Sequence, residues 1–467
     1  MEGEVVLMVE VVTIETPALG DRSYLAHDGQ VAVVVDPQRD IDRVLAAAGS
    51  VGVRITHVLE THIHNDYVTG GHALARQAGA AYMVAAAERV GFDRVPVHDG
   101  QRFHSGHMSV TARHTPGHTA DHMSYVLGDE KDEPVAVFTG GSMLFGAVGR
   151  TDLVSAEMTE ALTRSQYRSV RLLAAGLPGA TAVHPTHGFG SFCSAVPTTG
   201  NESTIAAERA TNLALVTADE DEFVKRLVEG LTAYPRYYAH MGPANRAGPS
   251  AAPADPPERL SADELRRQIL RGGWVVDLRQ RRAFAGAHLP GTISVELGDG
   301  FSTYLGWTIQ WGTPLTLIGE SPEDVAGAQR QLARLGIDHL EGAATGTPQD
   351  LAGPEATASY EVTDFAGLAQ SWGQAGQVVL DVRRPDEWEA GHLAGAAHVP
   401  LWELESRLGE LSDGVVWVHC GSGFRASIAA SLLARGGRRP VHVDDDWAAA
   451  AGAGLPLVEP DGDPAGR

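Results

Sequence analysis

The second half of the chain contains an internal repeat, which constrains the fold more than any other feature of the sequence. Residues 277–291 (DLRQRRAFAGAHLPG) are matched by residues 381–395 (DVRRPDEWEAGHLAG). In both runs a histidine follows the aspartate by 11 residues and a glycine follows it by 14. An aromatic residue, Phe284 or Trp388, lies between the aspartate and the histidine. Each copy continues into an apolar strand and an Ala/Leu-rich helix. The repeat therefore predicts two α/β modules of the same type, each about a hundred residues long.

The second copy carries a cysteine where a strand gives way to a helix. Residues 415–435 (VVWVHCGSGFRASIAASLLAR) predict a strand, a loop and a helix, with Cys420 at the end of the strand. Two glycines let the loop turn and expose N–H groups, and a helix starting near Ala426 points its positive end at the sulfur. This setting favours a reactive thiolate over a buried structural cysteine. The predicted catalytic residues are Cys420 and Arg425, and the predicted anion cradle comprises Gly421, Ser422, Gly423 and Phe424.

The first copy lacks this chemistry. When residues 315–325 are aligned on residues 415–425, Glu320 takes the position of Cys420 and Val325 that of Arg425. A negative side chain there repels an anion. We therefore expect residues 260–345 to form a non-catalytic module with a structural or docking role.

Both copies resemble rhodanese domains through the Asp-x-Arg and Gly-His-Leu-x-Gly runs, which the second copy reproduces almost in full. The Cys-x4-Arg spacing resembles that of sulfurtransferases, which carry sulfane sulfur on the cysteine. Tyrosine phosphatases have a larger Cys-x5-Arg loop sized for phosphate, so a phosphatase is a distant alternative. The resemblance implies that residues 357–460 form a rhodanese domain exchanging sulfane sulfur among thiosulfate, sulfite and a thiol. Arg383 is expected either to help bind the anion or to form a surface ion pair.

A second motif lies in the first hundred residues. Residues 61–70 (THIHNDYVTG) place His62, His64 and Asp66 at alternate positions, between a strand-like run and a helix-like run. Two imidazoles and a carboxylate on a tight loop can be aimed at one cation. A polar loop with chance histidines is the alternative, because the chain has 20 histidines. The added aspartate and the flanking elements favour a metal site.

This loop resembles the His-x-His-x-Asp-His signature of the metallo-β-lactamase fold, with Tyr67 in place of the last histidine. Together with TPGHT (115–119), FTGG (138–141) and GRTD (149–152), it makes residues 1–240 similar to persulfide dioxygenases and their glyoxalase II relatives. The fold class expected is a multidomain α/β protein, in which an αββα metallo-β-lactamase sandwich is followed by two α/β rhodanese-like domains. The Pro/Ala/Gly-rich residues 241–259 predict an extended, semi-rigid linker.

The resemblance also implies a ligand set. In persulfide dioxygenases one iron is held by the first histidine of the signature, the histidine of TPGHT and an aspartate of an FTGD run. Gly141 stands at the position of that aspartate, and Asp66 is the nearest carboxylate by motif, ahead of Asp121 and Asp152. His187 lies in a run similar to the segment that supplies a late histidine in the family. The predicted ligands of one metal ion, Fe(II) in preference to Zn, are His62, His64, Asp66, His118 and His187.

Three other side chains near these motifs have open roles. His57 and His122 are expected to support the site or to be structural. Cys193 is expected to be either a second sulfur relay or a buried small apolar residue.

The leading functional hypothesis is a fused sulfur-handling enzyme. Dioxygen and a glutathione- or coenzyme-type persulfide would react at iron to give sulfite, and the Cys420 domain would exchange sulfane sulfur with that product. A zinc-dependent thioester hydrolase like glyoxalase II is the second hypothesis. The third is a degenerate, metal-free first domain with only rhodanese activity.

The charge and cysteine content of the chain limit the partners and the compartment that we expect. The net charge of −23 argues against nucleic acid or an anionic membrane. The chain has only two cysteines, which argues against a disulfide scaffold and for a reducing compartment. The first ten residues are acidic rather than basic and fit a strand better than a signal peptide, so we expect a cytoplasmic protein. The expected partners are small molecules, namely a persulfide, thiosulfate or sulfite, and thiols such as glutathione, and the sequence is compatible with a homo-oligomer.

Local patterns predict the elements of the first domain. Asp40 is expected to cap a helix through residues 43–48 that stops at Gly49. The other expected strands are 31–36, 80–84, 108–113, 123–127 and 135–138, and the other expected helices are 157–174, 202–213 and 222–229.

Overall fold

The computed structural model describes residues 9–194, 198, 200–352, 357–412 and 414–458. The chain divides into two compact units. The first comprises Met1–Pro253 with Ala333–Gly336, and the second comprises Ala254–Leu332 with Ile337–Arg467. The strand expected within the first ten residues falls almost wholly outside the described residues, which begin one position before β1.

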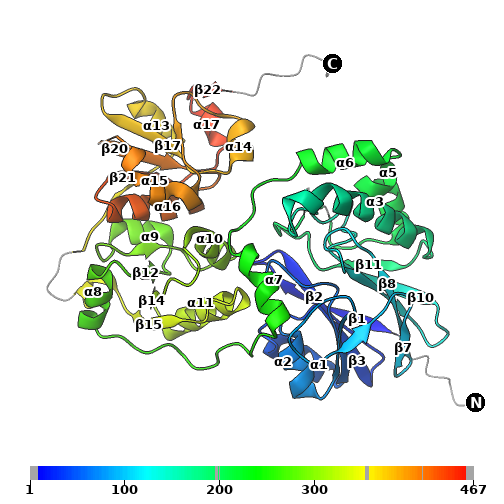
Figure 1. The fold of residues 1–467 in the computed structure, drawn as a ribbon. Helices are drawn as coiled ribbons and strands as arrows, with labels where there is room; N and C mark the ends of the chain where they lie inside the picture. The colour runs from blue at the N-terminus through cyan, green and yellow to red at the C-terminus, as the bar shows by residue number, and fades with distance from the viewer. Residues whose placement is uncertain (1–8, 195–197, 199, 353–356, 413, 459–467) are drawn as a thin grey trace, which may run out of the picture. The chain divides into compact units, whose positions relative to one another are not determined.

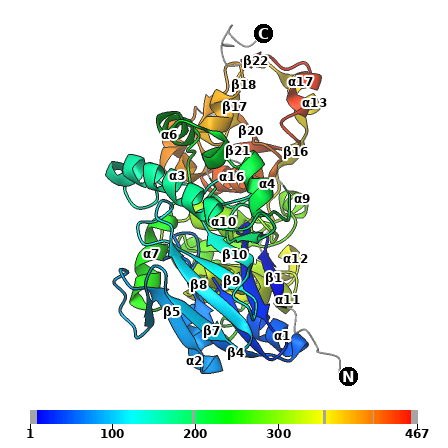
Figure 2. The ribbon, with the colours of Figure 1, turned by 90° about the vertical axis from the view of Figure 1, so that its right-hand side faces the viewer.

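The first unit is an αββα sandwich (Figures 1 and 2). One sheet has the order β1-β2-β3-β4-β5-β6, formed by Glu10–Thr16, Asp21–His27, Val31–Val35, Arg54–Leu59, Ala81–Ala85 and Val95–Val97. The other has the order β11-β10-β9-β8-β7, where β7 to β11 are Arg102–Ser105, Met108–His114, Met123–Gly128, Pro134–Gly140 and Ala182–Pro185. Tyr24, Tyr125 and Phe138 pack in the core between the sheets. The expected α/β architecture is confirmed.

Helices cover the outer face of each sheet. α1 (Asp42–Val51) and α2 (Gly71–Ala78) pack on the first sheet, while α3 (Thr159–Ala175) and α6 (Glu220–Glu229) cover the second (Figure 1). Strand β3 is buried at four of its five positions, because a strand with both faces covered carries a continuous apolar run. The remaining helical elements here are η1 (Ala156–Met158), α4 (Ile205–Thr211), α5 (Leu213–Val216) and α7 (Tyr238–Ala247).

Two local predictions were wrong. α1 begins at Asp42 without a side-chain cap, and Asp40 instead pairs with Arg43 at 2.7 Å. The helix passes Gly49 and ends at Val51, where it is capped by Gly52, whose φ of 72° lets its amide bond to the carbonyls of Ala48 and Gly49. The helix expected over 202–213 is two short helices, because Asn212 has extended backbone and caps the second one with its side chain.

The linker also differs from the prediction. α7 takes up residues 241–247, which were expected to be extended. It tolerates Pro243 and buries Tyr238, Met241 and Asn245. No helix in the described part of the chain is long and apolar enough to cross a membrane.

The second unit contains two mainly parallel sheets and a two-stranded β18-β22 ladder. The first sheet, β13-β12-β14-β15, comprises Ile293–Ser294, Trp274–Asp277, Leu315–Gly319 and Leu340–Thr345, and the second, β16-β21-β20-β17-β19, comprises Glu361–Thr363, Arg439–Val443, Val415–His419, Gln377–Asp381 and Ala397–His398. β18 and β22 are His392–Leu393 and Leu457–Val458. Its α-helices, α8 to α17, are Ala262–Leu270, Arg281–Gly286, Phe301–Thr308, Pro322–Arg334, Pro348–Ala352, Phe365–Ser371, Pro385–Glu389, Leu404–Arg407, Phe424–Arg435 and Ala449–Gly452. The 3-10 turns η2 and η3 are Leu401–Glu403 and Leu408–Glu410.

The repeated residues hold the same turn in both copies. Arg279 forms an ion pair with Asp277 and donates to the Ala287 carbonyl, and Arg383 makes the equivalent bonds to Asp381 and the Gly391 carbonyl. Arg383 is buried, so its ion pair with Asp381 is an interior one and not the surface pair that was expected, and a role in anion binding stays a prediction. The Asp-x-Arg run is therefore a structural element of the module, and its presence in the cysteine-free copy follows from this.

Candidate metal centre and cysteine site

Asp36 organises the two loops that carry the candidate metal ligands. It follows β3 with a φ of 50°, in the left-handed region that a non-glycine residue adopts at an energetic cost. Its carboxylate accepts hydrogen bonds from the Thr61 amide (2.7 Å), the Thr61 hydroxyl (2.6 Å) and the Thr186 hydroxyl (2.5 Å). Thr61 precedes His62 and Thr186 precedes His187, so one buried carboxylate positions both histidines.

The structure brings the five predicted ligands into one buried cluster. The His62 ring centroid lies 4.1 Å from that of His64, 4.7 Å from that of His118 and 5.3 Å from that of His187. Asp66 joins through His187, whose Nδ1 lies 3.1 Å from its carboxylate. All five side chains are at most 2% exposed, so the cluster is closed off from bulk water.

Three of these histidines have an outer hydrogen-bond partner at Nδ1. The Nδ1 atoms of His62, His118 and His187 lie 2.9, 2.7 and 2.9 Å from the Thr61 hydroxyl, the Arg150 carbonyl and the Asp21 carboxylate. Each of these oxygens can accept from an Nδ1–H group, so the Nε2 atoms of His62 and His118 can keep their lone pairs. Burial alone lowers the pKa of His187, but Asp66 and Asp21 outweigh it and raise the pKa well above its ordinary value. His62 Nε2 lies 3.3 Å from His187 Nε2, and His118 Nε2 has no hydrogen-bond partner among the described residues. Histidines oriented in this way are typical of metal sites.

Burial keeps two of the imidazoles neutral. It lowers the pKa of His62 well below its ordinary value, and neighbouring imidazoles lower it further. It also lowers the pKa of His118 to about 3. A metal ion needs the neutral imidazole, so these two side chains are held in the form that coordinates.

His64 is held by carboxylates on its other edge. Its Nε2 lies 3.0 Å from the Tyr67 hydroxyl, 3.2 Å from Asp36 and 3.3 Å from Glu60. Burial alone lowers the pKa of His64, but the two carboxylates outweigh it and raise the pKa to about 9. Its Nδ1 is buried with no hydrogen-bond partner in the described part of the chain. Tyr67, which replaces the signature histidine, therefore holds His64 in place rather than adding an imidazole donor.

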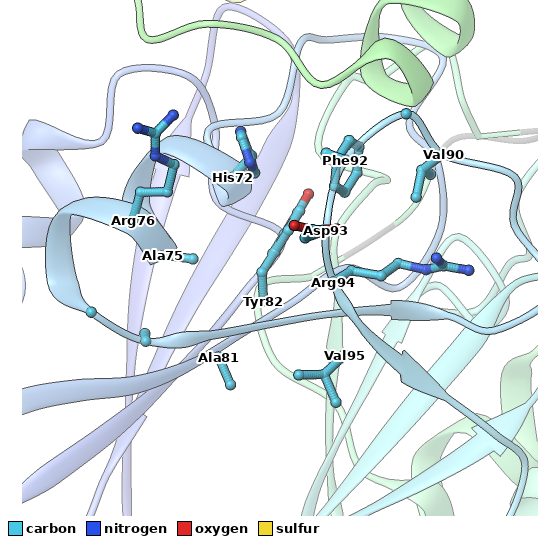
Figure 3. Close-up of a pocket in the computed structure, with 13 residues that line it drawn as sticks. His72, Ala75, Arg76, Ala81, Tyr82, Val90, Phe92, Asp93, Arg94 and Val95 are labelled. Atoms are coloured by element: carbon cyan, nitrogen blue, oxygen red, sulfur yellow. The ribbon is translucent and has the colours of Figure 1, made fainter.

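Glu60 connects this network to a surface groove of about 1040 Å³ (Figure 3). His72, Tyr82 and Phe92 form an aromatic wall of the groove, with Tyr82 and Phe92 centroids 5.4 Å apart. The Tyr82 hydroxyl donates to Glu60 Oε1 at 2.9 Å. None of the five predicted ligands is among the residues that line the groove, so its wall supports Glu60 from behind the cluster.

Asp21 and Asp66 lie on the Nδ1 edge of His187, away from His62. Asp21 lies 2.9 Å from that nitrogen and Asp66 3.1 Å from it. Burial raises the pKa of Asp21, helped by the Asp66 charge, whereas His187 holds the pKa of Asp66 below its usual range despite burial. Asp66, the carboxylate expected to join the histidines at the metal, thus faces the outer nitrogen of His187.

The position of the missing family aspartate is physically filled. A Cβ atom at Gly141 would lie 2.3 Å from His118 Cδ2 and 2.7 Å from His118 Nε2, so no side chain fits there without moving the ring. The Gly141 amide donates to His122 Nε2 at 3.1 Å, and His122 Nδ1 lies 2.9 Å from the Thr115 hydroxyl. His122 therefore has a supporting role, as expected.

Cys193 lies beside this cluster. One donor atom each of Cys193, His118 and His187 lie within 4.8 Å of one another. The Cys193 thiol is also 3.8 Å from the Tyr238 hydroxyl. Burial raises the pKa of this thiol well above its ordinary value, and the Asp66 and Asp21 charges add to that effect. The thiol is thus protonated when no cation is near.

These residues fit one metal ion. Several histidine rings lie together in a closed site and are oriented by hydrogen bonds to outer partners. His118 Nε2 has no hydrogen-bond partner among the described residues. Of the other carboxylates considered, Asp152 pairs with Arg150 at 2.7 Å and so is already engaged. Local sequence patterns did not identify Asp21, Asp36 or Arg150, because each acts on residues distant in the chain. Glu60 was also not singled out, although it acts on His64 only four residues away.

Asn245 of α7 fixes the His64 loop and was also missed. Its Nδ2 donates to the His64 and Tyr67 carbonyls (2.9 and 2.8 Å), and its Oδ1 accepts from the Thr69 amide (2.9 Å). Asn245→Ala leaves three buried backbone groups unpaired, so we expect the loop to lose about 3 kcal/mol of stability. The midpoint of the first urea unfolding transition of the full chain should fall. Asn65→Ala, at a half-buried position in the same loop, is the control, and an equal change in both variants would contradict the assignment.

The cysteine site in the second unit has the predicted strand, loop and helix. Cys420 follows β20 and is 1% exposed, and the Ala426 amide lies 3.4 Å from its Sγ. α16 begins after Gly423, whose φ is 83° and whose Cβ would lie 2.0 Å from Asp444 Oδ1. Only glycine fits this turn, which aims the positive end of the helix at the sulfur.

Arg425, the second predicted catalytic residue, is paired in the structure. Its guanidinium forms a bidentate pair with Glu387, at 2.5 and 2.7 Å, and its Cζ lies 5.8 Å from the Tyr304 ring centroid. Its positive charge is therefore largely compensated before any anion binds. Its catalytic role and the cradle role of residues 421–424 stay predictions.

The Glu387–Arg425 pair predicts an acid-dependent loss of stability. Burial alone raises the pKa of Glu387, but Arg425 outweighs it and lowers the pKa from 4.5 to about 2. Because the folded pKa is depressed, the contribution is present above about pH 4.5 and is lost as pH falls through about 2. Glu387→Gln should cost up to about 3 kcal/mol near neutral pH and nothing near pH 2. Urea unfolding across this range tests it, with the exposed Glu389→Gln as control, and a pH-independent difference would contradict it.

The cysteine-free copy supports the cysteine loop of the other. Glu320 is exposed at the end of β14 and Val325 is buried, in the alignment expected from the sequence. Arg281 donates to Asp444 at 2.7 Å, Arg282 also pairs with it, and Asp444 packs against Gly423. The first copy therefore braces the turn that positions Cys420.

Comparisons with known proteins found relatives of the metal domain and of the cysteine domain. The Rhodanese-like domain family matches residues 366–451. The persulfide dioxygenase ETHE1 of Bos taurus is 28% identical over 51% of this chain and 86% of its own length, and that of Homo sapiens is 28% identical over 45% and 74%. A probable zinc-dependent hydrolase of Bacillus velezensis is 30% identical over 34% of this chain and 68% of its own length.

A solved metallo-β-lactamase structure from Staphylococcus aureus superposes with a TM-score of 0.64 at 26% identity, covering 73% of this chain and 99% of that one. The cysteine loop lies within residues 366–451, which the Rhodanese-like domain family matches. The chain therefore belongs to the metallo-β-lactamase-fold proteins related to ETHE1, joined here to a rhodanese-like domain.

Proposed function

We propose that this chain is a fused enzyme of sulfur metabolism. Its first unit oxidises the outer sulfur of a thiol persulfide to sulfite, and its Cys420 domain moves sulfane sulfur between thiosulfate or sulfite and a thiol. The observation that carries the proposal is the closed cluster of four imidazoles. Three of them have an outer partner at Nδ1, and His118 Nε2 has no hydrogen-bond partner among the described residues.

The oxidation balances as persulfide, dioxygen and water giving thiol and sulfite. The sulfane sulfur loses four electrons, which reduce one dioxygen molecule, and water provides the third oxygen atom of sulfite. When bound, the metal ion supplies the redox chemistry of this step. Fe(II) is favoured over zinc because zinc has no redox chemistry and because relatives over much of this unit are persulfide dioxygenases.

The chain's own residues hold and orient that site. His62, His118 and His187 would bind the ion, while Asp21 and the Arg150 carbonyl fix the rings of the latter two. The buried setting excludes bulk water, which protects reactive intermediates from side reactions.

Sulfur transfer requires a nucleophilic sulfur and a place for the developing charge. The Cys420 thiolate attacks the outer sulfur of thiosulfate, the S–S bond breaks, and sulfite leaves with the bonding electron pair. The Ala426 amide and the positive end of α16 stabilise the anionic persulfide left on Cys420. A thiol acceptor then takes the outer sulfur and restores the thiolate.

A thioester hydrolase is the second candidate, because a hydroxyacylglutathione hydrolase of Brucella anthropi is 35% identical over 35% of this chain. Such chemistry usually uses a second metal, and Tyr67 is directed at His64 instead. The test is to load the full chain anaerobically with Fe(II) or Zn(II), then supply glutathione persulfide or S-lactoylglutathione. Sulfite formed only by the Fe(II) protein supports the proposal, whereas thioester cleavage by the Zn(II) protein without sulfite would overturn it.

A further inference from the structure

We propose that Cys193 is a further ligand of the same metal ion, grouped with His118 and His187, and that its sulfur replaces the carboxylate missing at position 141. This inference rests on the proposed function, because it assigns the donors of the same metal domain. From the sequence, Cys193 was expected to be either a sulfur relay or a buried small apolar residue.

The first support is the grouping of donor atoms. Cys193, His118 and His187 each offer one donor within 4.8 Å of the other two, and all three side chains are fully buried. His118 Nε2 has no other partner among the residues described, although it is polar and 0% exposed. Leaving such a lone pair unused in a dry interior is costly, and a cation would satisfy it.

Arg150 is hydrogen-bonded to both Cys193 and His118. Its backbone amide donates to the Cys193 carbonyl at 2.9 Å, and its own carbonyl lies 2.7 Å from His118 Nδ1. Its guanidinium donates to the Phe192 carbonyl at 3.0 Å. The backbone at Cys193 and the ring of His118 are therefore positioned together, independently of any ion.

The carboxylates form a second group of donors that shares His187 with the first. Asp66 groups with Asp21 and His187 on the Nδ1 edge of the His187 ring. The position from which the family aspartate would reach the metal is blocked, since the His118 ring lies where a side chain at residue 141 would start. The His118 ring thus takes the space of a side chain at position 141, and a donor atom of His118 is grouped with the Cys193 sulfur.

The donor chemistry defines the class of ion. Thiolate with imidazole suits borderline divalent ions such as Fe(II), Co(II) and Zn(II), and disfavours hard ions such as Mg(II) and Ca(II). Coordination releases the thiol proton, and the cation then balances the thiolate charge in the buried site.

The test uses cobalt(II) chloride with the full chain. The chain has only two cysteines, so in Cys420→Ser any thiolate ligand must be Cys193. We expect Co(II) bound to Cys420→Ser to show a near-ultraviolet sulfur-to-cobalt charge-transfer band. Adding Cys193→Ser should abolish the band and weaken Co(II) binding by about 100-fold or more, because even partners outside the coordination sphere contribute 10–100-fold.

The outcomes separate the two proposals. Tight Co(II) binding to Cys420→Ser without the charge-transfer band would overturn the role of Cys193 and leave the metal domain standing. Absence of Co(II) and Fe(II) binding to the parent chain would overturn both. The band is read in Cys420→Ser itself, so the result does not depend on whether the Cys193 variant folds.

Discussion

Replacing Cys420 with serine is expected to slow thiol-dependent release of sulfite from thiosulfate by about 1000-fold or more. A serine hydroxyl is a far weaker nucleophile at neutral pH and cannot carry sulfane sulfur, so both half-reactions fail. The metal content of the first unit should be unchanged, because Cys420 belongs to the other compact unit. Sulfite release and iron content per chain are the two measurements.

The control for this variant is Ser406→Ala, at an exposed position of the same domain, which should keep the parent rate. Mass spectrometry after incubation with thiosulfate should find one added sulfur on the peptide that contains Cys420. Sulfur transfer retained in Cys420→Ser would remove the nucleophile assignment.

The second large effect is expected for His118→Ala. His118 provides a neutral Nε2 that has no other described partner, and its ring is fixed by the Arg150 carbonyl. Its removal should weaken Fe(II) binding by about 100-fold or more and abolish sulfite formation from persulfide. Equilibrium dialysis with Fe(II) under anaerobic conditions measures the first effect directly.

His57→Ala is the matched control. His57 lies in β4, with its ring centroid 4.7 Å from that of Phe103 and its Nδ1 2.9 Å from the Thr56 hydroxyl, so its loss should leave iron binding intact. Equal iron affinity in parent and His118→Ala would show that the metal, if bound, lies elsewhere.

Patterns that are local in the sequence predicted most of the architecture. The 277–291 and 381–395 runs predicted two similar modules because their residues interact within one turn, as the Asp381–Arg383 pair does. The His62 loop was recognisable because its donors alternate between a strand and a helix. Cys420 was recognisable because the strand end, the glycines and the helix start are consecutive.

Contacts between distant residues could not be predicted. Asp36 reaches Thr186 across 150 positions, and Asn245 reaches His64 across 181. The pairing of Arg425 with Glu387 depends on how two elements pack, so the sequence did not indicate it. At position 141 the sequence indicated only a missing carboxylate, whereas the structure shows the His118 ring in the space that a side chain would need.

The most direct test of the account is oxygen uptake by the full chain, reconstituted anaerobically with Fe(II) and supplied with glutathione persulfide. We expect one dioxygen consumed for each sulfite formed, with no uptake by His118→Ala. That result would establish a persulfide-oxidising site that works with glycine at position 141. Iron binding without oxygen uptake in the parent chain would contradict the account and leave Cys420 as the sole sulfur-transferring centre.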